Sequence, residues 1–297
     1  MASKAAVSSV TVICSDKTGT LTENRMTVTV LDLANEAVVL TGESSGPLTL
    51  TEMGADAIAQ GLEAALAVGA LCNDAALTVT DGGNRSVGDP TETALVLAAA
   101  ELEIPKPGLD DLFPRIDEVP FDSTRKRMTT IHSVPESLPT WVDGVATVFP
   151  EGTTAASFMK GAVERVITSS SSVLVAGKIE AMSDEWERRI IERTEEIAAT
   201  GTRVLAVAGS GWTTPPTEEQ AEDGLVFIGL FGLMDPPRPE VSEAVATAKT
   251  AGISTVMITG DHPLTARHIA TEVGIDPDGD LLTGADLDRM NDAQLVD

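Results

Sequence analysis

Residues 9–22 read SVTVICSDKTGTLT, and this stretch decides the fold class of the chain. Its first half is rich in β-branched residues and predicts a short, buried strand of a parallel sheet. Asp16 follows this strand directly. Because open α/β sheets bind ligands at the carboxyl ends of their strands, we expect the Asp16 carboxylate to lie in a functional loop.

The residues after the strand suit phosphate chemistry. An aspartate in a loop can attack a phosphoryl group if a cation screens the approaching negative charges. Lys17 adds positive charge, while Thr18, Gly19 and Thr20 offer hydroxyls and backbone amides to phosphate oxygens or to magnesium. A lone Asp-Lys-Thr would indicate only an ordinary polar turn, but the full string DKTGTLT is far more specific.

A second α/β segment occupies the end of the sequence. Pro239–Ala251 predicts a helix that begins on proline and ends at Gly252, and Ile253–Ile258 predicts the next strand. A turn, Thr259-Gly260-Asp261, and another helix, Pro263–Val273, follow. Together with the first strand, these elements predict a doubly wound α/β domain. With only two identifiable strands, we expect this domain to be truncated.

The intervening residues follow another pattern and predict a mixed α+β domain. Hairpin strands are expected at 26–50, helices at 55–73, 90–103 and 183–200, strand pairs at 115–134 and 144–162, and strands at 202–210 and 225–231. A block of about 200 residues is large enough to be a domain. We therefore predict a first α/β segment at 1–25, an inserted domain at 26–234 and a second α/β segment at 235–297.

Composition narrows the possible partners. The chain has 46 acidic and 20 basic residues, a formal net charge of -26, so a broad nucleic-acid-binding surface is not expected. The longest apolar run, Leu225–Met234, is half the length needed to cross a bilayer and predicts a buried strand. Cys14 and Cys72 lie far apart, and the three histidines form no ligand cluster, so neither a disulfide framework nor a zinc site is predicted.

Asp16–Thr22 resembles the phosphorylation signature of the P-type ATPases, whose catalytic domain resembles the haloacid dehalogenase fold. DPPRP at 235–239 and TGDHP at 259–263 resemble that family's hinge and second phosphate-site motifs. The resemblance implies that ATP phosphorylates Asp16 and that Asp16 and Thr18 hold Mg²⁺. It also implies that the segment with Asp235 and Arg238 joins the inserted domain to the phosphorylation domain, near the nucleotide.

The same resemblance assigns roles in the second phosphate-site motif. Thr259 and Gly260 join the catalytic set, with Thr259 holding a phosphoryl oxygen, and Asp261 would lie beside the nucleotide.

The inserted block resembles the family's nucleotide-binding domain. In GDPTETAL at 88–95, Glu92 matches the residue that contacts the adenine amino group, and Phe121 matches the aromatic that stacks on adenine. Lys126 and Met128 follow at the family's spacing. An aromatic face suits a base and cations suit phosphates, although Phe121 alone would more often be a core residue.

Two further matches complete the expected ATP site. Lys160, followed by Gly161, would lie deep in the adenine pocket, and Arg203, with Leu205, would reach the phosphates. Taken singly, each of these residues also fits an ordinary structural role.

Three functions fit this pattern: the cytoplasmic ATP-binding part of a cation pump, a soluble phosphatase of the same fold, and a nucleotide-binding module without catalysis. Such phosphatases usually carry a second aspartate two residues after the nucleophile, where this chain has Thr18, so the pump is favoured. The motifs around Glu92, Lys160 and Asp261 resemble the calcium- and sodium-pump branch, and calcium is the expected ion.

The pump reading carries further expectations. The partners would be the remaining phosphorylation domain, the actuator domain and the membrane helices of the same pump. The family's further lysine and its Gly-Asp-Gly-x-Asn-Asp motif do not follow Asp261, so we expect ATP binding without turnover by this chain. TGES at 41–44 spells the family's dephosphorylation motif, but its position after Asp16 indicates a turn without a catalytic role.

Overall fold

The computed structural model describes residues 10–34, 37–41, 49–50, 56–80, 83–199, 201–260, 263–275, 279, 281–287 and 289–290. The chain divides into two compact units. The flanking unit contains Met1–Asn24, Ala199–Gly201 and Asp235–Asp297, and the central unit contains Arg25–Ala198 and Thr202–Met234.

The central unit is built on a ten-stranded sheet. Eight strands follow the order β4-β3-β2-β13-β12-β9-β8-β7, while β10 pairs with β13 and β11 pairs with β10. All of these pairs are antiparallel except β10 with β13. The strands are β2 (Thr27–Asp32), β3 (Ala37–Thr41), β4 (Thr49–Leu50), β7 (Arg115–Asp122), β8 (Arg127–Ser133), β9 (Ala155–Gly161), β10 (Ser170–Val175), β11 (Lys178–Ala181), β12 (Arg203–Trp212) and β13 (Leu225–Met234).

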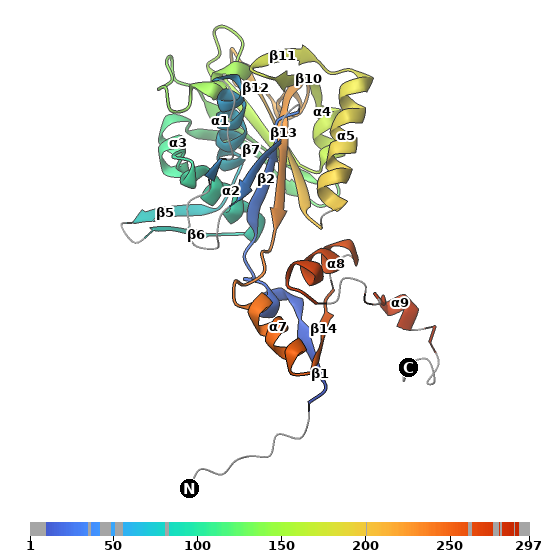
Figure 1. Ribbon diagram of the computed structural model, residues 1–297. Coiled ribbons are helices and arrows are strands. Elements are labelled where there is room, and N and C mark those ends of the chain that lie inside the picture. Colours follow the sequence, from blue (N-terminus) through green and yellow to red (C-terminus); the bar gives the residue numbers. More distant parts are fainter. Residues whose placement is uncertain are drawn as a thin grey trace. The chain divides into compact units, whose positions relative to one another are not determined.

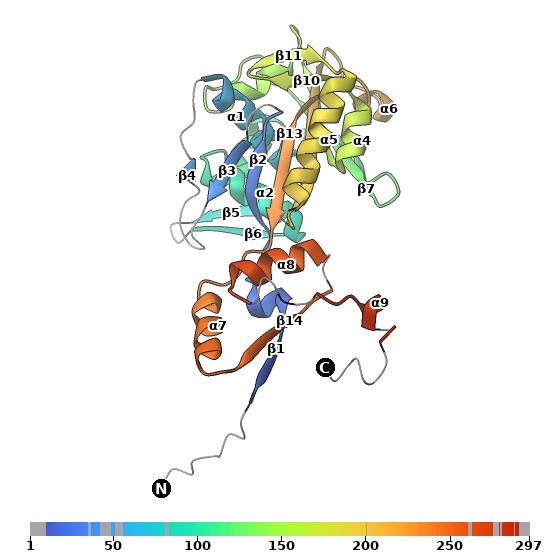
Figure 2. The same cartoon turned by 45° about the vertical axis from the view of Figure 1, so that its right-hand side comes forward.

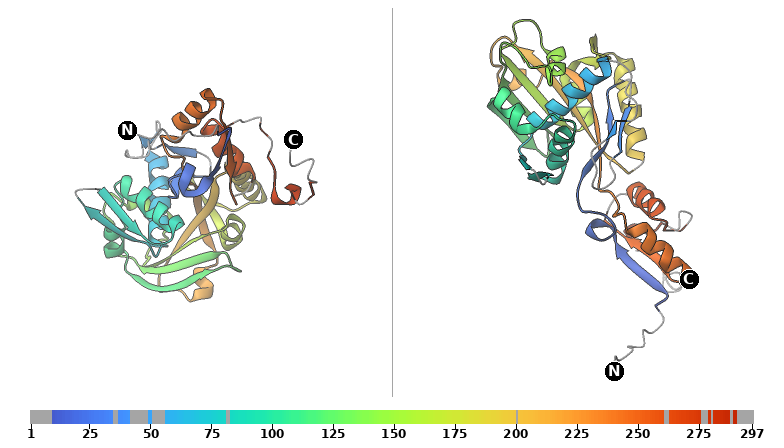
Figure 3. Two further views of the ribbon diagram at one scale, coloured as in Figure 1. Left: turned by 90° about the horizontal axis from the view of Figure 1, so that it is seen from below. Right: turned by 60° about the vertical axis from the view of Figure 1, so that its left-hand side comes forward.

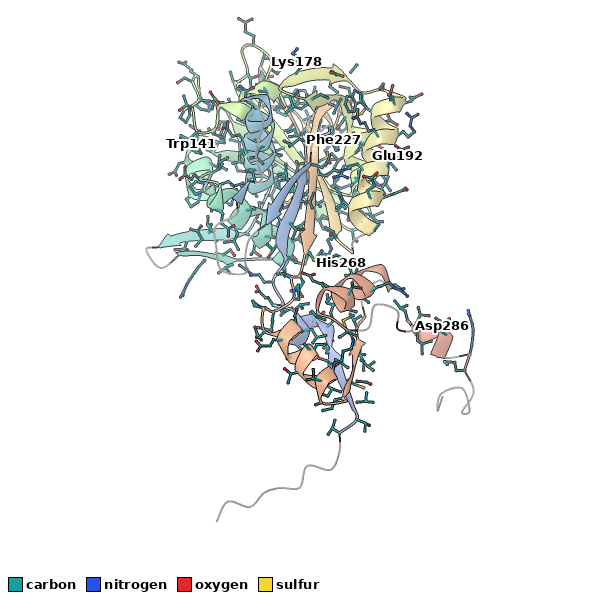
Figure 4. All side chains as sticks on the ribbon, in the orientation of Figure 1. Trp141, Lys178, Glu192, Phe227, His268 and Asp286 are labelled. Atoms are coloured by element: carbon teal, nitrogen blue, oxygen red, sulfur yellow. The ribbon has the colours of Figure 1, made fainter. Side chains whose placement is uncertain are left out.

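Strand β13 confirms the prediction of a buried strand, because every residue from Leu225 to Leu233 is buried. It lies between β2 and β12 at the middle of the sheet (Figure 1). The aromatic side chain of Phe227 is fully buried there, whereas Glu192 lies on the outer side of α5 (Figure 4).

Helices cover both faces of this sheet (Figure 2). One apolar core joins the sheet to α1 (Asp56–Leu71), α2 (Pro90–Glu101) and α3 (Lys106–Leu112), and a second core joins it to α4 (Val163–Ser169) and α5 (Asp184–Ala199). Charged α5 buries only Ile190 and Ile197, which are two helical turns apart and so share one face. The short helix α6 (Glu218–Ala221) precedes β13.

The flanking unit contains a pair of parallel strands, β1 (Val12–Asp16) and β14 (Ser254–Ile258). A helical turn, η1 (Lys17–Leu21), follows β1, and the helices are α7 (Val241–Thr250), α8 (Pro263–Glu272) and α9 (Gly284–Leu287). Helix α7 runs beside the strand pair (Figure 3). It ends where predicted, because Gly252 takes the left-handed backbone conformation, with φ +75°, that glycine tolerates best.

Two sequence predictions are wrong. Strand β1 is parallel as predicted but not buried, since Val12 and Ile13 are 49% and 42% exposed. Within the described residues no third strand joins this pair, so each of the two strands keeps one unpaired edge. The predicted strand pair at 144–162 is also incorrect, because Asp143–Val148 forms a 3-10 helix, η2, and only β9 is a strand.

Several elements were not predicted, among them α3, α4 and the separate hairpin of β5 (Ala76–Thr80) and β6 (Gly83–Val87). In the TGES stretch, Thr41 ends β3, and residues 42–44 lie outside the described residues. Among the helices described here, none combines the length and the apolar character that a membrane span requires.

Candidate functional site

Helix α2 presents Glu92 in its first turn. Asp89 caps the helix by accepting a hydrogen bond from the Thr91 amide at 2.8 Å, and Pro90 begins it. Gly88 has a φ of +153°, and a Cβ there would come within 2.9 Å of Ala75. The Gly-Asp-Pro sequence is therefore explained by a close approach, a proline and a cap, which together fix the start of the helix.

Glu92 forms an ion pair with Lys160 on β9. Lys160 Nζ lies 2.5 Å from Glu92 Oε1, and their side chains are only 8% and 16% exposed. The other carboxylate oxygen accepts a hydrogen bond from the Asp74 amide at 3.3 Å. Burying two charges is favourable only with such pairing, so the pair fixes α2 against the sheet. It also places a cation and an anion together in a largely apolar setting.

Met128 lies directly beside this pair. It is opposite Lys160 in the β8–β9 register and is 1% exposed. The buried Cys72 thiol donates to the Met128 carbonyl at 3.4 Å, and burial raises its pKa. This packing of Met128 with Cys72 and Lys160 thus joins β8, β9 and the end of α1.

The β7–β8 hairpin carries Phe121, near the end of β7, and Lys126, in the turn. Phe121 is 62% exposed, which is unusual for a phenylalanine and makes its ring available for stacking. The carboxylate of Asp122 accepts the Thr124 and Arg125 amides, and these hydrogen bonds lower its pKa. Lys126 is exposed with a φ of +55°, and no partner of its side chain is found in the part of the chain that the structure describes.

Gly161 brings this turn against β9. A Cβ at Gly161 would lie 2.6 Å from the Lys126 carbonyl oxygen and 2.7 Å from Arg127 Cβ, so only glycine fits. The Ala162 amide donates to the same Lys126 carbonyl at 2.9 Å. The position of Lys126 is therefore coupled to the strand that carries Lys160.

Strand β12 supplies Arg203 and Leu205. Exposed Arg203 donates to Thr91 Oγ1 at 3.3 Å, so it reaches the first turn of α2, one residue from Glu92. Leu205 packs partly buried against the apolar core on the α1–α3 face. Four segments of the central unit that are distant in sequence, namely α2, the β7–β8 hairpin, β9 and β12, thus carry the eight residues expected to bind ATP.

Asn73 and Arg115 support this arrangement and were not recognised in the sequence. Asn73 donates to the carbonyls of Gly69 and Glu92, which ties α1 to α2. Arg115 donates to the Asn73 carbonyl and to the carboxylates of Asp74 and Glu118. Burial acts to lower its pKa, but the hydrogen bonds to Asp74 and Glu118 outweigh burial and raise the pKa. The only signal in the sequence is a polar Asn-Asp pair directly after an apolar helix.

Asp16 lies in the flanking unit at the carboxyl end of β1. Its register partner is Ile258, so Thr259 and Gly260 leave the neighbouring strand at the same edge. The carboxylate is exposed, and we find no hydrogen bond to it within the described ranges. Asp261 lies outside the described residues. The following Lys17 is buried, at 5% exposure.

The DPPR segment is hydrogen-bonded to the loop after Asp16. Thr22 Oγ1 lies 2.6 Å from Asp235 Oδ2, and Arg238 Nη2 donates to the Gly19 carbonyl at 3.0 Å. The backbone adds an Arg238 amide bond to the Leu21 carbonyl at 2.9 Å. Thr18 and Gly19 have non-helical backbone angles inside η1. Asp235 and Arg238 therefore hold the loop that contains Thr18.

Comparisons with known proteins agree with this description. Residues 61–240 match the family model described as "P-type ATPase, cytoplasmic domain N". The chain is 36% identical to "Calcium-transporting ATPase 1" of Bacillus cereus over 98% of its own length and 29% of that protein. It is 36% identical to "Cation-transporting ATPase pma1" of Synechocystis, over 98% of the chain and 32% of that protein.

A eukaryotic relative is equally similar. The chain is 36% identical to "Calcium-transporting ATPase 1" of Saccharomyces cerevisiae over 97% of its length and 30% of that protein. The chain thus spans less than a third of the length of these relatives. The family model covers most of the central unit, and the relatives align with nearly the whole chain, so this chain belongs to the P-type ATPase family and contains its cytoplasmic domain N.

Proposed function

We propose that this chain is the ATP-binding and phosphate-accepting part of an ATP-driven cation pump. In this proposal the central unit binds ATP, and the flanking unit, a phosphorylation domain of the haloacid dehalogenase type, presents Asp16 to its γ-phosphate. The buried Lys160–Glu92 pair is the observation that carries the proposal. It joins the two elements expected to surround adenine in an otherwise strongly acidic chain.

The residues of the central unit fit a nucleotide. The exposed Phe121 ring can stack on a base, and the Glu92 carboxylate can accept a hydrogen bond from the adenine amino group. Lys126 and Arg203 are exposed cations that suit phosphate oxygens. The boundaries of the two units near residues 25 and 235 support an inserted nucleotide-binding domain within a phosphorylation domain.

The flanking unit fits phosphoryl transfer to Asp16. Asp16, whose carboxylate is exposed, and Thr259 lie where two parallel strands end at one edge of the sheet. A phosphoryl group on Asp16 would therefore have the Thr259 hydroxyl within the same cluster of loops. Asp16 and Thr18 would supply the oxygen ligands that magnesium prefers. When bound, magnesium neutralises phosphoryl charge. Thr18 in place of a second aspartate disfavours the phosphatase alternative.

Calcium is the ion we propose, because the relatives from Bacillus cereus and Saccharomyces cerevisiae are named calcium-transporting ATPases. The chain would then face the cytoplasm in a larger protein. Its partners would be the rest of the phosphorylation domain, the actuator domain and the membrane helices of the same pump.

Titration of the chain with MgATP by calorimetry tests the proposed site. Phe121→Ala should weaken binding by about tenfold or more, since stacking on an aromatic ring contributes about 1–3 kcal/mol per base. Ile116→Ala is the matched control, because Ile116 is an exposed apolar residue on the same strand. Equal affinities of the unsubstituted chain and Phe121→Ala would contradict the stacking role.

A further inference from the structure

Glu222 is the centre of a polar network that it forms with side chains of β8 and of the turn before β8. The residue follows α6 and precedes β13, and its side chain is 11% exposed. Its carboxylate accepts hydrogen bonds from Arg125 Nη1 at 2.7 Å, Arg127 Nε at 3.0 Å, Arg127 Nη2 at 2.7 Å and Thr129 Oγ1 at 3.0 Å. Burial acts to raise the pKa of Glu222, but the hydrogen bonds from Arg127, Arg125 and Thr129 outweigh it and lower the pKa.

This network reaches the end of β7, where Phe121 lies, and the turn that follows it. Arg125 donates from Nη2 to the Pro120 carbonyl at 2.6 Å while its Nη1 binds Glu222. The guanidinium therefore bridges the carboxylate to the residue before Phe121. On the other side of the turn, the fork of Arg127 binds Glu222 at the first residue of β8. Both ends of the turn are thus held by one carboxylate from a segment about 95 residues away.

Such support matters for Phe121 because burial does not fix its ring. Its ring is mostly exposed, and the β7–β8 register shifts between Val119 and Asp122, so regular strand pairing is interrupted there. Lys126 is likewise exposed, in a left-handed conformation. A backbone held from both sides restricts these two side chains, and less conformational entropy is then lost when a ligand binds.

We propose that Glu222 is a positioning residue of the nucleotide site, which acts through Arg125 and Arg127. It holds the Phe121 ring in place for stacking. It also engages the guanidinium groups of the two arginines beside Lys126 in ion pairs, so that Lys126 is the cation of this turn whose side chain has no partner among the described residues. The inference rests on the proposed function, since it assumes that Phe121 and Lys126 bind ATP.

The test is a double-mutant cycle on MgATP affinity, measured by calorimetry with the complete chain. Glu222→Gln keeps the size of the side chain and removes its charge, and we expect an affinity loss of about tenfold. In a Phe121→Leu background, which removes the flat stacking surface, the same substitution should cost less than about threefold. Glu219→Gln is the matched control, because Glu219 is an exposed acid on α6.

The outcomes separate positioning from general stability. An equal loss in both backgrounds would assign Glu222 a purely structural role and overturn the proposal, as would unchanged affinity in folded Glu222→Gln. If that variant does not fold, Arg125→Lys replaces it, because lysine keeps the charge but not the two-ended bridge; it should show the same dependence on Phe121. Absence of saturable binding by the unsubstituted chain would instead overturn the proposed function itself.

Discussion

At the scale of single residues, the buried Lys160–Glu92 pair gives a prediction on stability. Among the described residues, Lys160→Met leaves the buried Glu92 carboxylate with the Asp74 amide as its one hydrogen-bond partner, and should lower the free energy of unfolding by about 3 kcal/mol. Adding Glu92→Gln should restore part of this loss, because no buried charge is then left unpaired. Urea unfolding measures both effects. Strictly additive losses in the double variant would contradict this account.

His132 gives a prediction on pH. It is fully buried on β8, with Nδ1 2.7 Å from the Phe113 carbonyl oxygen and Nε2 2.9 Å from Thr130 Oγ1. Burial lowers its pKa from 6.5 to about 4. Between these values the unfolded chain binds a proton that the folded chain does not, so stability falls as the pH falls from about 6.5 to about 4.

The size of this effect can be tested by substitution. A pKa shift of this size corresponds to a loss in the free energy of unfolding on the order of 3 kcal/mol as the pH falls from about 6.5 to about 4. Unfolding measured at several pH values should show a shallower slope for His132→Gln than for the unsubstituted chain. Identical slopes for both proteins would show that His132 does not titrate in this way.

At the scale of elements, the DPPR segment and the η1 loop act as one structure. Arg238→Ala removes the bond to the Gly19 carbonyl, and the loop that follows Asp16 should open more often. Hydrogen exchange at the Gly19 and Thr22 amides should accelerate about tenfold or more, since a bond from a charged donor contributes about 1.5–3 kcal/mol. Lys249→Ala, an exposed cation on α7, should leave these amides unchanged. Equal exchange rates in both variants would show that Arg238 does not hold the loop after Asp16 closed.

Elements were predictable from the sequence where local signals agreed with packing. Pro239 and Gly252 flank α7, whose first residue comes two positions after the predicted proline, and β13 is a continuous apolar run. The 143–148 segment failed because its structure depends on a distant contact. Gly144 donates to the Glu63 carboxylate at 3.1 Å, and a Cβ there would lie 2.6 Å from the Gln60 carbonyl oxygen. Close packing against α1 overrides the strand-like pattern.

The residues of the candidate site were likewise predictable where a local motif marks them, and not where their arrangement depends on tertiary contacts. Lys160, Glu92 and Phe121 stand in recognisable motifs, and the structure brings Lys160 and Glu92 into contact. Glu222 stands in no motif, and only the folded sheet brings it to Arg125 and Arg127. The residues proposed to contact the nucleotide are therefore easier to find in the sequence than the residue proposed to position them, because positioning depends on tertiary contacts.

At the scale of the whole molecule, the charge distribution constrains how an anion can bind. The chain carries a formal net charge of -26, so its overall field opposes ATP. Binding would therefore depend on local cations, and in the central unit the guanidinium groups of Arg125 and Arg127 are already held in ion pairs with Glu222. Exposed Lys126 and Arg203 are then the cations of the candidate site that remain for phosphates.

The division of the chain into two units also predicts that the central unit folds and binds nucleotide without the flanking unit. Thr27 and Met234 are register partners on β2 and β13, so the two ends of a 25–234 fragment meet on adjacent strands. The contacts described around Glu92, Phe121, Lys126 and Lys160 all come from within the central unit. We therefore expect the fragment to fold cooperatively and to bind MgATP within about threefold of the complete chain, a difference of about 0.6 kcal/mol. Phe121→Ala should weaken binding to the fragment as it does to the complete chain. A folded fragment with affinity reduced more than about tenfold would show that the flanking unit contributes directly to nucleotide binding.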